Sequence, residues 1–71
     1  MLRTTKVSAV GVAGLIGLLG DAVAPVRSNA AWALGALDDA RATEPLARLS
    51  TDADPSVRRQ AAWALGHVGG Q

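Results

Sequence analysis

One stretch of the chain occurs twice. Val26–Gly35 reads VRSNAAWALG and Val57–Gly66 reads VRRQAAWALG, at an offset of 31 residues. When residues 8–40 are aligned on residues 39–71, 13 of the 33 pairs are identical. A fixed period between about 20 and 50 residues is the signature of a solenoid built from stacked supersecondary units. This repeat constrains the fold more than any other feature of the sequence.

Each repeat is predicted to contain two helices joined by a short turn. The first helix is expected over residues 9–19, because its apolar residues have the i, i+3, i+4, i+7 spacing of an amphipathic helix. These residues are Val12, Leu15, Ile16 and Leu19. Gly20 and Asp21 are expected to form the turn, and Pro25 suits the first turn of the second helix because its φ is already helical.

The helical projection of the second helix predicts its core face. The residues that share this face are Val26, Ala30, Ala33, Leu34 and Leu37. A polar link follows over residues 38–42. Glu44 and Pro45 then indicate the start of the third helix, whose buried edge is expected at Leu46 and Leu49.

The fourth helix has the clearest start signal in the chain. Asp54 can accept hydrogen bonds from the free N–H groups of the first turn, and Pro55 fits the first helical position. The helix is expected to run to about Val68, where Gly69 and Gly70 allow a left-handed stop.

The sequence therefore predicts an all-α fold, an α-solenoid of two helix-turn-helix repeats and four helices. The expected single domain covers residues 1–71, with a lead-in over 1–7, repeat 1 over 8–38 and repeat 2 over 39–71. The chain has no cysteine, so disulfides cannot stabilise so small a core. Because about three repeats are usually needed for a continuous core, we expect further repeats or stacking of copies. Leu49, Val57 and Leu65 are predicted to lie uncovered at the open end.

The N-terminal segment has two interpretations. Arg3, Lys6 and the apolar run over 7–20 resemble a secretory leader, with Ala22-Val23-Ala24 as a cleavage site. The repeat runs through this segment, however, which a cleaved leader has no reason to show. A cytoplasmic protein is therefore expected, with secretion as the alternative. The apolar run is also shorter than the roughly 20 residues of a membrane-spanning helix and contains four glycines.

The repeated stretch resembles HEAT repeats of the roughly 31-residue, bilin-lyase-like subclass. The matching text is D-x-x-x-x-V-R-x-x-A-A-W-A-L-G, with a linker similar to D-x-R-A-x-x-P-L over residues 39–46, and the resemblance covers about residues 8–71. It is specific for the fold and unspecific for activity. Members of this class include scaffolds, chaperone-like binders, bilin lyase subunits and iron-dependent hydroxylases. The hydroxylases use His-Glu pairs, whereas His67 is followed by Val68.

The resemblance implies a structural ladder along the stack. Asp21 and Arg27 have the same six-residue spacing as Asp52 and Arg58. In similar repeats such residues connect the turn with the neighbouring repeat. An arginine fork beside a helix start can indeed hold a loop carboxylate in bidentate geometry.

The two tryptophans are the candidates for partner binding. On the helical projection, Trp32 and Trp63 lie well away from the core side of their helices. Arg59, Trp63 and His67 form an i, i+4, i+8 stripe, with Gln60 beside it. The resemblance implies that these helices line a concave, partner-binding surface. The alternative is that each Trp packs on the neighbouring repeat, with Arg59 covering the indole.

Nothing in the sequence indicates catalysis. His67 is the single histidine and lacks the companions that a metal site or a catalytic triad requires. No cofactor and no metal are expected. The net charge of +1 argues against nucleic-acid binding along the arginines. The predicted function is a non-catalytic protein–protein interaction scaffold. The alternative is an accessory subunit of a bilin lyase, in which the aromatic pair would stack on a tetrapyrrole.

Overall fold

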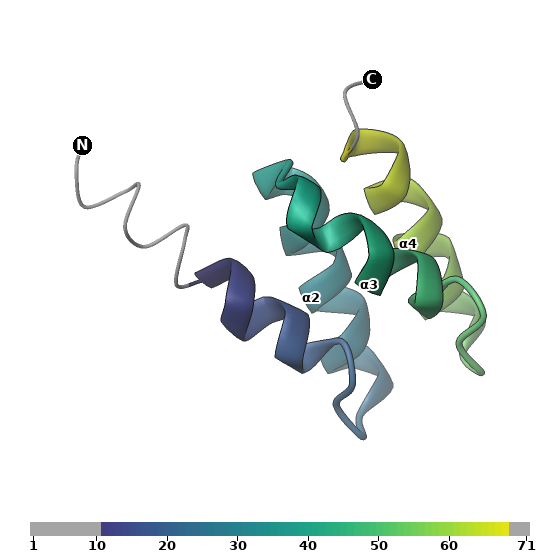
Figure 1. The fold of residues 1–71 in the computed structure, drawn as a ribbon. Coiled ribbons are helices and arrows are strands. Elements are labelled where there is room, and N and C mark those ends of the chain that lie inside the picture. Colours follow the sequence, from purple (N-terminus) through teal and green to yellow (C-terminus); the bar gives the residue numbers. More distant parts are fainter. Residues whose placement is uncertain (1–10, 69–71) are drawn as a thin grey trace.

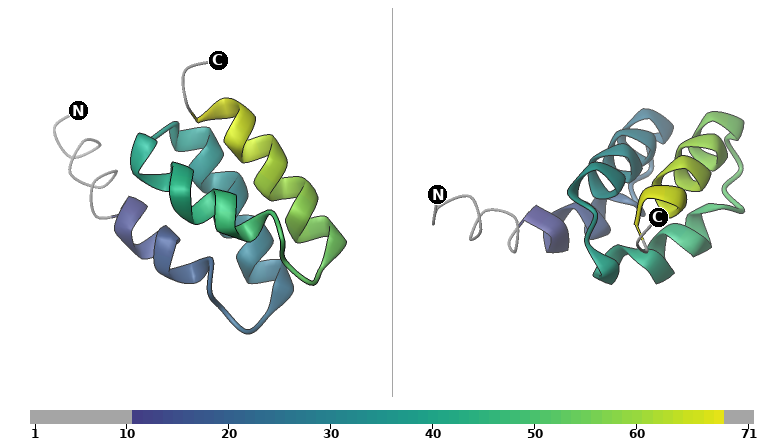
Figure 2. Two further views of the ribbon diagram at one scale, coloured as in Figure 1. Left: turned by 45° about the vertical axis from the view of Figure 1, so that its right-hand side comes forward. Right: turned by 90° about the horizontal axis from the view of Figure 1, so that it is seen from above.

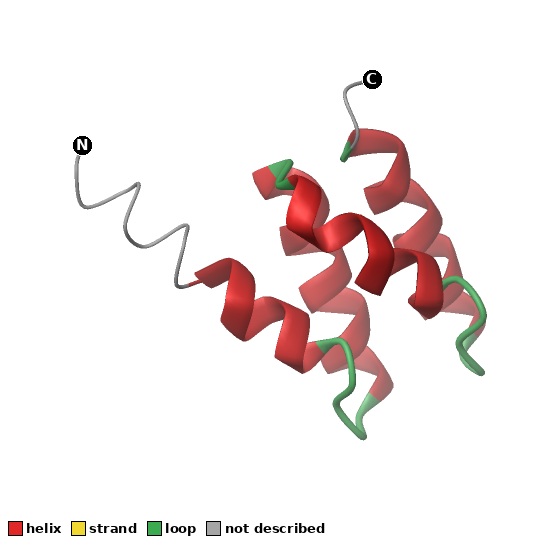
Figure 3. Cartoon of the chain, in the orientation of Figure 1, coloured by secondary structure: helices red, strands yellow, loops and turns green. Residues whose placement is uncertain are grey.

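The computed structural model describes residues 11–68. Within this span the chain is helical and contains no strand, so the predicted all-α fold is confirmed (Figure 3). The first helix occupies residues 11–18. It is followed by α2 (Ala24–Leu37), a 3₁₀ turn η1 (Ala40–Ala42), α3 (Thr43–Leu49) and α4 (Pro55–His67). The first helix and α2 form one helix pair, and α3 and α4 form a second.

The two helix pairs stack side by side in two layers. The first helix and α3 make one layer, and α2 and α4 make the other (Figures 1 and 2). Close contacts join α2 to α4 and α3 to α4. This is the arrangement that a 31-residue repeat of helix pairs predicts, because each helix lies beside its own equivalent.

The helix ends follow from a few residues. Proline stands at the start of both α2 and α4. The carboxylate of Asp54 accepts hydrogen bonds from the backbone N–H groups of Ser56 at 2.8 Å and Val57 at 3.3 Å. Asp54 is therefore the N-cap that the sequence predicts. At the other end of α2, Asp38 ends the helix in the left-handed conformation, with φ of 53°.

The core lies between the two layers and is built mostly from alanine, leucine and valine. Its buried members are Val12, Leu19, Ala30, Ala31, Leu34, Ala42, Leu46, Leu49, Val57, Ala61, Ala64 and Val68. No polar side chain is buried in the part of the chain that the structure describes. Small side chains allow the helices to approach closely, which suits a two-layer stack.

The predicted core face of α2 is wrong at one end. Leu37 is exposed, whereas Ala31 and Gly35 are buried. The reason is that α2 also packs along α4, which covers the side of α2 that carries Gly35. A single core direction therefore describes its burial poorly.

The predicted open end is also wrong for two of its three residues. Leu49 and Val57 are buried, and Leu65 is partly buried against the core. Leu49 lies near Leu19 of the first helix pair, at the edge of a shared groove. Val57 is fully buried, as are Ala61 and Ala64 of the same helix.

Candidate partner-binding surface

The two tryptophans stack on each other across the helix pairs. Their ring centroids lie 6.4 Å apart and their planes differ by 8°. The 31-residue period explains this contact, because equivalent positions on α2 and α4 lie side by side. Both indoles remain exposed, Trp32 by 52% and Trp63 by 37%. The two interpretations of the sequence, surface and inter-repeat packing, therefore both describe part of the arrangement.

Gly35 makes the approach of Trp63 to α2 possible. A Cβ atom on Gly35 would lie 2.7 Å from Cζ3 of Trp63 and 2.8 Å from Cα of Ala64. Real Cβ atoms do not make contacts this short, so only glycine fits at this position. In the sequence, Gly35 is distinguished only as the last residue of the repeated stretch. Its role depends on Trp63 of the neighbouring helix, so it can be recognised only once α2 and α4 are known to adjoin.

His67 extends the aromatic surface along α4. Its ring centroid lies 4.1 Å from that of Trp63, with the planes inclined by 34°. Its Nδ1 is 3.2 Å from the carbonyl oxygen of Trp63. Arg59 is exposed and Gln60 is partly buried on the same helix. We call Trp32, Arg59, Gln60, Trp63 and His67 the aromatic face.

The structure joins two of the four ladder residues in an ion pair. Nε of Arg27 donates to Oδ1 of Asp52 at 2.8 Å, and Nη2 donates to Oδ2 at 3.0 Å. The pair connects α2 with the turn before α4, so it links the two helix pairs. Within each pair the arginine instead binds a backbone carbonyl. Nη1 of Arg27 donates to the backbone carbonyl oxygen of Asp21 at 2.8 Å. Nη1 of Arg58 donates to the backbone carbonyl oxygen of Asp52, also at 2.8 Å.

The ion pair affects the acid–base behaviour of both partners. The guanidinium of Arg27 lowers the pKa of the Asp52 carboxyl below its usual 3.8, and the N–H of Asp54 contributes in the same direction. Asp52 in turn raises the pKa of Arg27. Both side chains are mostly shielded from solvent. The contact is therefore better placed to stabilise the fold than an open surface pair would be.

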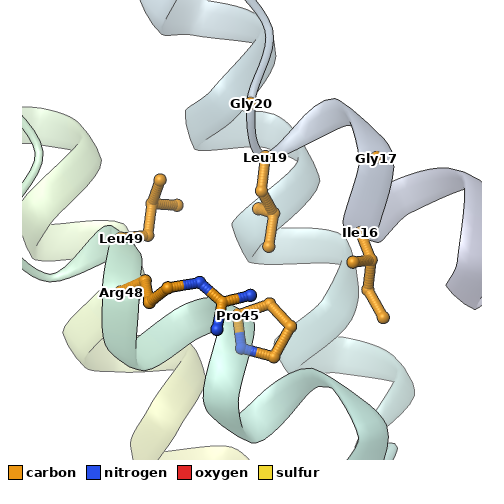
Figure 4. Close-up of a pocket in the computed structure, with 7 residues that line it drawn as sticks. All are labelled: Ile16, Gly17, Leu19, Gly20, Pro45, Arg48 and Leu49. Atoms are coloured by element: carbon orange, nitrogen blue, oxygen red, sulfur yellow. The ribbon is translucent and has the colours of Figure 1, made fainter.

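A groove on the other layer was not anticipated from the sequence. It has a volume of about 310 Å³ and lies between the first helix and α3 (Figure 4). Its lining is apolar apart from one cationic side chain, and consists of Ile16, Gly17, Leu19, Gly20, Pro45, Arg48 and Leu49. The glycines leave space where side chains would otherwise fill the contact.

The described residues contain no candidate metal-binding cluster. No group of three or more His, Cys, Asp or Glu side chains within residues 11–68 is placed to hold a metal ion. None of the helices in that span is both long and apolar enough to cross a membrane. Residues 1–7, the predicted lead-in, lie outside the described residues.

Comparison with known protein families matches residues 12–71 to HEAT repeats. The chain belongs to the HEAT-repeat family. This agrees with the two-layer stack of helix pairs, and HEAT repeats generally mediate protein–protein interaction and are typically non-catalytic. A comparison with curated proteins found no match. The match to HEAT repeats thus establishes the architecture of the chain.

Proposed function

We propose that this HEAT-repeat chain is a non-catalytic interaction module that binds a protein partner through its aromatic face. The observation that carries the proposal is the stacked tryptophan pair, whose indoles stay exposed although they pack on each other. Tryptophan and arginine are among the residues enriched at interaction hot spots. The aromatic face offers two tryptophans with Arg59 on the adjoining turn of α4.

The packing around Trp63 supports the same proposal. Trp63 is held over Gly35, and its other neighbours are Trp32 and His67. A side chain already fixed in place loses little conformational entropy when a partner binds. The aromatic face is therefore suited to presenting flat apolar area to a protein surface.

Photo-crosslinking tests the proposal. One variant carries p-benzoylphenylalanine at Gln60, on the aromatic face, and a matched variant carries it at Glu44, an exposed residue of α3 in the other layer. Both are irradiated in an extract of the cells that produce the protein. We expect a defined protein adduct from position 60 that is absent from position 44 and weakened by Trp32→Ala. Equal adducts from both positions, or none from position 60, would contradict the proposal.

Accessory bilin binding is the second candidate function. It rests on the near-parallel indoles of Trp32 and Trp63, since a flat aromatic surface can stack on a tetrapyrrole. In this case the chain would hold the pigment, and catalysis would belong to another subunit. Titration with biliverdin tests this candidate. A change in visible absorbance together with quenching of Trp fluorescence supports it, and unchanged spectra exclude it.

A further inference from the structure

Equivalent positions in the two helix pairs differ in exposure. Leu18 is 42% exposed, whereas its equivalent one repeat later, Leu49, is 7% exposed. Leu37 is 41% exposed, whereas its equivalent, Val68, is 3% exposed. The second pair buries these positions against the first pair. The first pair presents the same apolar positions to solvent, on the side turned away from the second pair.

The opposite end of the stack shows the complementary difference. Ala31 and Gly35 on α2 are buried under α4. Their equivalents on α4, Ala62 and Gly66, are exposed, and a Cβ atom on Gly66 would meet nothing within 4 Å. The second pair therefore has the same surface on which the first pair holds its neighbour. We call this surface, around Ala62 and Gly66, the open socket, because no helix among residues 11–68 covers it.

The ladder residues show the same relation in charge. Arg58 and Arg27 each donate to the backbone carbonyl of the residue six positions earlier, at 2.8 Å. Arg27 also pairs with the carboxylate of Asp52, whereas no carboxylate among residues 11–68 pairs with Arg58. Asp21 is oriented like Asp52: each carboxylate accepts a hydrogen bond at 2.9 Å from the backbone N–H two residues later. The second pair thus carries a guanidinium, that of Arg58, already oriented by a hydrogen bond to a backbone carbonyl. The first pair carries a carboxylate, that of Asp21, already oriented by a backbone N–H.

We infer that copies of this chain stack head to tail, with the first helix pair of one copy docked on the second helix pair of the next. Asp21 of one copy pairs with Arg58 of its neighbour, and Trp32 lies over Gly66 as Trp63 lies over Gly35. Such a contact joins two different faces, so it does not close and allows growth beyond a dimer.

The partner is a second copy because the required contact already exists once within the chain. The first pair carries the apolar positions, the tryptophan and the aspartate with which the second pair docks, and the second pair carries the matching arginine, alanine and glycine. A symmetric contact between two first pairs would instead bring Asp21 near Asp21 and leave Arg58 unused. The inference goes beyond the proposed function, since stacking uses the ends of the molecule and extends the aromatic face.

Two blocking variants test the arrangement. Ala33→Glu places a charge on the exposed side of the first pair, where the equivalent residue Ala64 is buried. Ala62→Glu places one on the open socket. In sedimentation velocity we expect the unmodified chain to pass from monomer to dimer and larger species with rising concentration. Each blocked variant should stay monomeric, whereas an equal mixture of the two should form a dimer and grow no further.

Two further variants keep the test decisive. Ala13→Glu introduces the same charge at an exposed position of the first helix, where the equivalent residue of the docked second pair is already an exposed glutamate, Glu44, so we expect association to be unchanged. Gly66→Ala adds one methyl group to the socket without endangering α4, and should weaken association by about tenfold or more. A chain that stays monomeric up to millimolar concentration overturns the inference. So does a dimer that survives Ala62→Glu. Crosslinking from position 60 reports on the aromatic face whether or not copies stack, so the two proposals can fail separately.

Discussion

At the scale of single residues, Gly35 and Gly66 show how a repeat gives one amino acid two roles. Both glycines end the same ten-residue stretch. A side chain on Gly35 would collide with Trp63 and Ala64, whereas one on Gly66 would meet nothing within 4 Å. The two glycines are equivalent in the sequence. They differ in the structure because α4 packs against Gly35, whereas no helix of the described span packs against Gly66.

Alanine substitution should therefore have opposite effects at the two sites. Gly35→Ala is expected to destabilise the fold by about 1–3 kcal/mol, because the tryptophan and α4 must move to admit the methyl group. Gly66→Ala is expected to stabilise it by up to about 1 kcal/mol through the higher helix propensity of alanine. Urea denaturation of dilute samples measures both. A Gly35→Ala variant as stable as the parent would show that α2 and α4 do not approach this closely.

The tryptophan stack gives a second prediction at this scale. A double-mutant cycle with Trp32→Ala and Trp63→Ala should yield a coupling free energy of about 0.5–1.5 kcal/mol, since the offset-stacked rings interact beyond their buried area. Trp63→Ala alone should cost more than Trp32→Ala, because Trp63 also covers Gly35. Thermal denaturation of the four proteins measures the cycle. Additive losses would mean that the rings do not interact.

At the scale of elements, the first helix is the one with the most unfavourable composition. Gly11, Gly14 and Gly17 all lie in it, and a Cβ atom at each of them would meet no neighbour within 4 Å. Glycines in a helix can allow a neighbouring helix to approach closely, or they can simply lower the stability of the helix. The structure excludes close approach at all three, and they remain a cost in conformational entropy.

Gly14→Ala should consequently stabilise the protein by about 0.5–1 kcal/mol. The residue lies in the middle of the helix and is exposed, so added helix propensity is not offset by a clash. Chemical denaturation gives the free energy, and hydrogen exchange of the amides over residues 11–18 locates the gain. A destabilised variant would indicate a contact that the helix makes through its glycine face.

The elements also show how far the sequence could predict the fold. The proline residues and Asp54 mark the starts of α2 and α4, and the repeat alone fixes which helices adjoin. The exposure of Leu37 was missed, because a helical projection assumes a single buried direction. The projection correctly separated the tryptophans from the core, but contact between the two rings depends on the spacing of α2 and α4. That spacing is set by Gly35, whose role appears only in three dimensions.

At the scale of the whole molecule, the Arg27–Asp52 pair is the polar link between the two helix pairs. Within residues 11–68, the other side-chain contacts between the two pairs are apolar. Because the carboxylate sits in the turn before α4, the pair also fixes where the second pair begins relative to the first. Protonating Asp52 therefore weakens the junction rather than an isolated helix.

The protein is expected to lose stability in acid through this junction. The pKa of Asp52 in the fold is lower than the 3.8 of an unperturbed carboxyl, so its stabilising contribution is complete above pH 3.8 and disappears as the pH falls below that value through the folded pKa. Asp39, whose pKa Arg41 lowers to about 2, loses its contribution between pH 3.8 and about 2.

Asp52→Asn should reduce the slope of melting temperature against pH in this range. Arg27→Gln should reduce it less, because the N–H of Asp54 still stabilises the Asp52 carboxylate. A slope unaffected by either substitution would show that acid sensitivity arises elsewhere in the chain.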